Sequence, residues 1–114
     1  MQSVTSNAVY EALGQWETIF TDNLTYSIKG LQTNNGKYLA IHFQGLNFVN
    51  QMLLGALPAK WRPKFVTRFM FIVDSVLNIG LANILNTGEI NLYCEAKSTG
   101  FAYGDYMIKI SEDL

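Results

Sequence analysis

The chain has 114 residues, which is enough for one domain with a modest hydrophobic core. Eight Lys and Arg residues stand against nine Asp and Glu residues, and this near-neutral balance argues against a nucleic-acid partner, because proteins that neutralise many phosphates carry a clear basic excess. Hydrophobic residues make up 49% of the chain and charged residues only 15%, so we expect apolar surface left over for a partner and predict an oligomer.

The first segment, residues 3–13 (SVTSNAVYEAL), is predicted to form a short helix that begins with polar capping residues and stops at Gly14. Four apolar residues share one face at helical spacing: Val9, Ala12, Leu13 and Trp16. A helix of about two to three turns is not stable alone in water, so we expect this face to contact the rest of the domain or its own copies in an oligomer. Residues 1–15 are therefore assigned to a short helical segment and residues 16–114 to a separate β-rich domain.

Beyond Gly14 the hydrophobic period changes from about 3.6 to 2, which is the period of β-strands. Turn residues separate the alternating runs, which are the segments 16–20, 24–31, 36–45, 65–74, 76–85, 89–96 and 101–110. In the third run, Leu39, Ile41 and Phe43 share one face. Short strands with turns at this spacing predict an all-β fold, either an antiparallel β-sandwich or a jelly-roll-like barrel.

Residues 69–73 (FMFIV) are apolar at consecutive positions, so both faces of that strand need cover. The outer face of an isolated two-sheet sandwich is normally polar. We therefore expect a second subunit to cover one face and assign Phe69 and Phe71 to the oligomer interface. The run is much shorter than the roughly 20 residues of a membrane helix, so no membrane insertion is expected.

The chain offers few residues for chemistry. Its one cysteine, Cys94, shares a strand face with Ile90 and Leu92 and is predicted to be buried. Its one histidine is His42, and there is no phosphate loop, dinucleotide fingerprint or metal-ligand spacing. We therefore expect no metal, no cofactor and no catalysis. A polysaccharide-degrading enzyme stays as an alternative, because two carboxylates could still meet in space.

Between the strands lies a corner, residues 55–65 (GALPAKWRPKF), in which cations and aromatic rings are mixed. Such a mixture could be a rigid turn, a ligand contact or a single-strand nucleic-acid site. Pro58 and Pro63 restrict the backbone, which favours the turn. In that interpretation Trp61 is buried and backbone carbonyls or a carboxylate hold Arg62; contact between Trp61 and a ligand is the alternative.

Two of these stretches resemble bacteriophage tail-fibre and baseplate proteins. SVTSNAVYEAL is similar to a segment that joins a stem to a C-terminal head in such proteins. Leu57-Pro58 followed by Trp61-Arg62-Pro63 resembles their "LP-x-x-aromatic-RP" corner, and the stretch from Ile84 to Ile90 around Gly88 resembles the hairpin after it. Ala59-Lys60 departs from the usual Glu-Gly, and Trp61 stands where Tyr is commoner.

This resemblance implies that residues 1–15 are the end of a stem and that residues 16–114 form a homotrimeric β-sandwich head, which binds saccharide of the host cell surface. It also implies a place in a phage virion or a prophage, with other tail or baseplate proteins as neighbours. Saccharide sites favour aromatic rings beside a few carboxylates and amides. On that basis the candidate ligand-binding residues are Tyr103, Asp105, Tyr106, His42 and Trp61. A purely structural trimerisation or capping module of a phage tail is the main alternative to adhesion.

Overall fold

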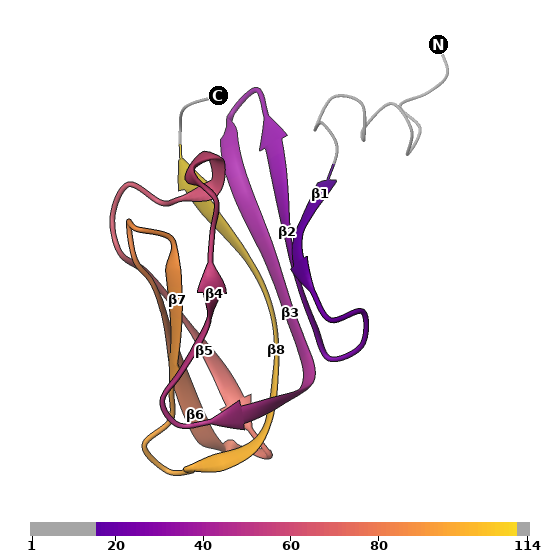
Figure 1. Cartoon of the computed structure of the whole chain (residues 1–114), viewed down its shortest axis with the longest axis vertical. Helices are drawn as coiled ribbons and strands as arrows, with labels where there is room; N and C mark the ends of the chain where they lie inside the picture. Colours follow the sequence, from indigo (N-terminus) through magenta and orange to yellow (C-terminus); the bar gives the residue numbers. More distant parts are fainter. Residues whose placement is uncertain (1–15, 112–114) are drawn as a thin grey trace.

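β-Strands make up most of residues 16–111, the part of the chain that the computed structural model describes (Figure 1). The strands are β1 (Trp16–Thr21), β2 (Tyr26–Thr33), β3 (Gly36–Val49), β4 (Met52–Ala56), β5 (Thr67–Val73), β6 (Ser75–Ile84), β7 (Glu89–Tyr93) and β8 (Thr99–Ser111), with a 3₁₀ turn, η1 (Ala59–Trp61), after β4. The predicted N-terminal helix, with Val9, Ala12 and Leu13, lies outside the described residues. Trp16, the fourth residue of its predicted apolar face, is the first residue of β1 and lies opposite Leu31.

All eight of these strands join one antiparallel sheet in the order β1-β2-β3-β8-β5-β6-β7-β4. The sheet curls into a half-barrel (Figure 1), so the predicted antiparallel all-β fold is confirmed. Bulges in β1, β3 and β4 increase the local bend and twist of those strands. The curl brings the two edge strands together: a Cβ placed on Gly55 of β4 would lie 3.4 Å from the ring of Phe20 in β1.

The seven predicted runs all contain strands, with ends shifted by a few residues. β3 continues past its predicted end because a bulge at Gln44/Leu46 keeps Leu46 and Phe48 pointing into the core. β4 was not predicted, because its sequence (MLLGA) has no alternation and its side chains are half-buried or exposed. Edge strands of this kind carry a weak sequence signal, since only one neighbour constrains them.

The core lies on the concave side of the sheet, and side chains alternate into it as expected. Leu39, Ile41 and Phe43 all point inward, and Cys94 is buried, as predicted. Near the centre, the ring of Phe71 lies 5.8 Å from that of Phe43 and 5.6 Å from that of Phe48. These edge-on aromatic contacts join β3 to β5 across the core.

The assignment of Phe69 and Phe71 to an oligomer interface is wrong. Both are buried inside this chain, whereas Met70 between them is 59% exposed and Ile72 is half-buried. The strand is indeed apolar on both faces, but β5 pairs with β6 and β8, so the sheet itself directs alternate side chains into the core. Of the two outward residues, Met70 is exposed and Ile72 is only partly covered within the described residues.

The corner is a structural element. Trp61 is 1% exposed, which confirms the packed interpretation and excludes its ring as a surface for ligand. Its ring covers Gly30 of β2, where a Cβ would lie 2.6 Å from the indole carbons, and its Nε1 donates a hydrogen bond to Glu17 Oε2 at 3.3 Å. Arg62 Nε donates to the carbonyl of Leu57 at 2.9 Å, so the prediction for this side chain is also confirmed.

The corner also binds the turn between β6 and β7. The N–H of Leu57 donates to the carbonyl of Gly88 at 2.8 Å, and the backbone of Gly88 has φ +95°, a conformation that favours glycine. The corner and hairpin that carry the resemblance to phage proteins are therefore in direct contact. Together with the Trp61 contacts to β1 and β2, this joins the corner both to the β1 edge of the curled sheet and to the β6–β7 turn.

Candidate functional site

The outer, convex face of the sheet carries rows of side chains that cross several strands. One row is polar throughout: Thr21 of β1 lies opposite Ser27 of β2, which lies opposite His42 of β3, which lies opposite Asp105 of β8. Directly opposed residues in an antiparallel sheet point to the same face and lie close enough to act together. Two hydroxyls, an imidazole and a carboxylate therefore line up across four strands.

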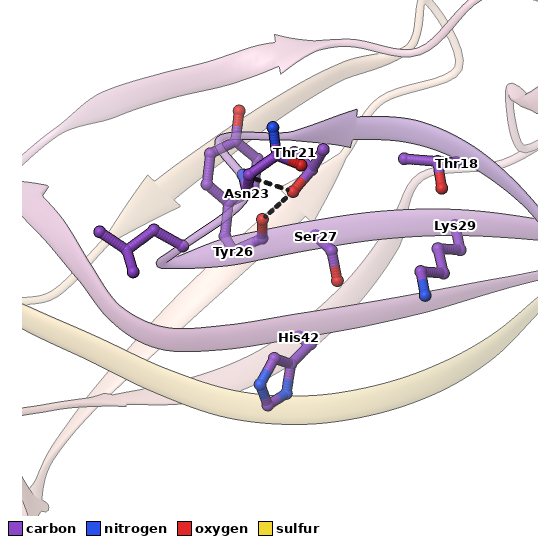
Figure 2. Close-up of a pocket in the computed structure, with 8 residues that line it drawn as sticks. Thr18, Thr21, Asn23, Tyr26, Ser27, Lys29 and His42 are labelled. Carbon is purple, nitrogen blue, oxygen red and sulfur yellow. Dashed lines mark hydrogen bonds between the residues drawn. The ribbon is translucent and has the colours of Figure 1, made fainter.

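A polar groove of about 360 Å³ lies over the β1–β2–β3 part of this face (Figure 2). Its lining residues are Thr18, Thr21, Asn23, Leu24, Tyr26, Ser27, Lys29 and His42. In Figure 2 the side chains of Thr18, Lys29 and His42 project from three adjacent strands, and the loop between β1 and β2 closes one end. The register explains this grouping, since Thr18 lies opposite Lys29 and Ser27 lies opposite His42.

The loop that closes the groove is held in one shape by Asp22. Its Oδ1 accepts hydrogen bonds from the N–H groups of Leu24 (2.9 Å), Thr25 (2.6 Å) and Tyr26 (3.1 Å), and the Thr25 hydroxyl donates to Oδ2. The hydrogen bond from the Thr25 hydroxyl, followed by those from the backbone, holds the pKa of Asp22 well below its ordinary value of 3.8. This end of the groove is thus formed without a ligand.

A carboxylate whose pKa is lower in the folded than in the unfolded chain stabilises the fold at any pH above its pKa in the unfolded chain. That stabilisation is lost as the pH falls toward the pKa in the folded chain. We expect the melting temperature of the wild type to fall as the pH is lowered from 5 to 2.5. The melting temperature of the Asp22→Asn variant should fall less steeply over the same range. The amide oxygen still accepts loop hydrogen bonds but has no charge to lose. Thermal melts at several pH values measure this, with the exposed Glu95→Gln as control. Identical pH slopes in the wild type and Asp22→Asn would contradict it.

The groove contains polar groups that are free to bind. The side chains of Thr18, Ser27 and Lys29 make no hydrogen bond or ion pair with other residues of the 16–111 stretch. The Thr21 hydroxyl, by contrast, donates to the carbonyl of Tyr26 and accepts from a loop N–H. Two hydroxyls and an ammonium group are therefore available to a ligand.

Three of the five predicted ligand residues lie together: His42 lines the groove, and Asp105 and Tyr103 lie beside it on β8. His42 Nδ1 lies 3.7 Å from Asp105 Oδ1, and His42 Nε2 lies 3.2 Å from the side-chain oxygen of Gln44. Gln44 in turn lies opposite Tyr103 on β8. These residues form the β3–β8 side of the polar face.

The other two predicted ligand residues lie elsewhere. Tyr106 points to the core side, where its ring centroid lies 4.9 Å from that of Phe69, and burial, with a further contribution from the charge of Asp105, raises its pKa. Trp61 is in the core, so neither ring is a groove residue. Conversely, Thr18, Ser27 and Lys29 were not predicted as site residues. The alternation of Ser27 and Lys29 with buried Ile28 was a usable signal, but it marks any exposed strand face.

No protein-family model and no curated protein matches this chain. The role of the groove therefore has to be inferred from its own chemistry. Within the described stretch, no three His, Cys, Asp or Glu side chains gather as metal ligands, and no helix there is long and apolar enough to cross a membrane.

Proposed function

We propose that this chain is the head of a phage or prophage tail fibre and binds saccharide of the host cell surface through the polar groove, without catalysis. The observation that carries the proposal is the groove itself, with the free hydroxyls of Thr18 and Ser27 beside Lys29 and His42. Sugars present many hydroxyl groups. A preformed surface of hydroxyl, imidazole and ammonium groups can form hydrogen bonds with them and loses little conformational entropy on binding. The motif order of the sequence supports a place in a virion, next to other tail or baseplate proteins.

The ring of Tyr103 adds to this fit. It lies on the same outer face, one row from the His42–Asp105 pair, and is partly exposed. Aromatic rings stack on the apolar C–H face of sugars, while neighbouring polar groups bond the hydroxyls. A saccharide chain that extends from the groove over His42 would reach this ring.

The proposal is tested with the purified full chain on a glycan array and on intact host cells. A double variant, Thr18→Val with Ser27→Ala, removes both free hydroxyls and keeps similar shapes, so we expect binding to fall while the melting curve is kept. A purely structural module would bind no glycan in either form. Release of reducing ends from host polysaccharide would instead favour an enzyme.

The proposal includes a homotrimer, which the other half of the outer face supports. Apolar side chains there lie opposite one another across β5, β6 and β7: Met70 and Leu81, Leu81 and Tyr93, and Ile72 and Ile79. We refer to these five residues (Met70, Ile72, Ile79, Leu81 and Tyr93) as the apolar half. Large contiguous apolar patches are rarely exposed on soluble monomers and often mark contact surfaces.

We expect Met70→Glu to weaken self-association, since a buried unpaired carboxylate at a subunit contact is unfavourable. Met107→Glu is the matched control, because Met107 is 63% exposed on the same outer face but lies on β8 outside the apolar half. Sedimentation at several concentrations measures the mass of both variants. Equal masses for the two variants and the wild type would contradict a contact through the apolar half.

A further inference from the structure

Lys29 is a cation without a counter-charge in the described part of the chain. It is exposed on the outer face of β2, between Thr18 on β1 and Ala40 on β3. The residues two positions away along β2 are the half-buried Ser27 and the buried Leu31. None of these residues is acidic, so no carboxylate lies opposite or beside it on the sheet.

The carboxylates of this region are engaged elsewhere. Glu17 Oε1 forms an ion pair with Lys60 at 3.2 Å, and its Oε2 accepts from Trp61; these hydrogen bonds, that from Trp61 first, lower the pKa of Glu17. Asp22 is engaged by the loop N–H groups and the Thr25 hydroxyl. Asp105 lies beside His42. Among residues 16–111, no carboxylate thus neutralises Lys29, and its charge faces the groove.

We propose that the groove selects saccharides that carry an anionic group, either a carboxylate or a phosphate, and that Lys29 contacts this group. This inference rests on the proposed function, because it names the substrate class of the same groove. A charge-assisted hydrogen bond from an ammonium group is stronger than a neutral one. The free hydroxyls of Thr18 and Ser27 on either side of Lys29 can donate to the remaining oxygens of the anion.

The test uses two matched pairs of probes: oligogalacturonate with its methyl ester, and glucose 6-phosphate with glucose. Binding to the full chain is followed by amide chemical shifts of Ser27 and His42 in NMR titrations. We expect at least one charged probe to bind in the groove about tenfold more tightly than its neutral partner, and less tightly as salt is added. The pair that shows this preference identifies whether the anion is a carboxylate or a phosphate.

Variants separate a specific contact from general attraction. Lys29→Gln should reduce binding of the charged probe to that of the neutral one, and Lys29→Arg should restore much of it. Lys64→Gln, which removes another exposed cation, should leave binding unchanged. Equal losses in Lys29→Gln and Lys64→Gln would overturn the inference, as would no preference for either charged probe.

Different experimental results would contradict this inference and the proposed function. If neutral glycans bind in the groove as well as acidic ones, the anion preference is wrong and saccharide binding stands. If neither the probes nor host polysaccharide shifts the Ser27 and His42 amides, both proposals fail.

Discussion

Trp61→Ala should destabilise the protein by about 3–5 kcal/mol, the usual cost of removing a large buried aromatic side chain. The ring is 1% exposed and fills the space above Gly30, so its loss leaves a cavity between the corner and β2. The variant also loses the hydrogen bond from the indole to Glu17, which joins β1 to the corner. Both effects weaken the packing of the β1–β2 edge of the sheet against the corner. Urea unfolding at neutral pH measures the combined change in the free energy of unfolding.

Phe65→Ala is the control for this experiment. Phe65 is an aromatic residue of the same corner but is 77% exposed, so its truncation should change the free energy of unfolding by no more than about 0.5 kcal/mol. Similar losses for the two variants would show that the corner contributes through its aromatic content in general and not through the buried position of Trp61.

Phe71→Ala is the second substitution for which we expect a large effect. It should also lower the free energy of unfolding by about 3–5 kcal/mol. The ring contacts Phe43 and Phe48 of β3, and it covers Gly80 of β6, where a Cβ would lie 2.6 Å from one of the ring carbons. Three strands therefore lose packing at once. Because Gly80 has no side chain to fill the space, the neighbouring strands can relax only partly into the cavity.

Phe101→Ala provides the comparison, since Phe101 is 53% exposed on the outer face of β8. We expect Phe101→Ala to lower the free energy of unfolding much less than Phe71→Ala does. The midpoint and slope of urea unfolding measure this for both variants. The experiment also checks which face of β5 is inside. If Phe71→Ala left the free energy of unfolding unchanged and instead reduced the mass in solution, Phe71 would lie at a subunit interface and not in the core.

The candidate site was only partly predictable. His42, Asp105 and Tyr103 could be named because histidine, carboxylates and aromatic rings are typical of binding sites. Their proximity depends on the pairing of β3 with β8, which joins positions about 60 residues apart in the sequence. No local pattern encodes that register. Ser27 and Lys29 are ordinary surface residues until β1 and β3 are placed on either side of them.

The sequence by itself determined the class of fold and the local geometry of its parts. The period of two requires strands with one apolar face, which is why Leu39, Ile41 and Phe43 point inward together. The two prolines likewise determine a rigid corner, because they restrict the backbone whatever surrounds it. These properties depend on covalent structure and on near neighbours, so they can be read from the chain.

Only the tertiary structure decided which surfaces are covered. The run from Phe69 to Val73 is apolar on both faces, and its inner face was identified only when β6 and β8 lay on either side of β5. The partners of Trp61, Gly30 and Glu17, are likewise distant in sequence: Glu17 precedes it by 44 positions. Burial and register depend on contacts between segments that are far apart along the chain, and the folded sheet is what brings those segments together.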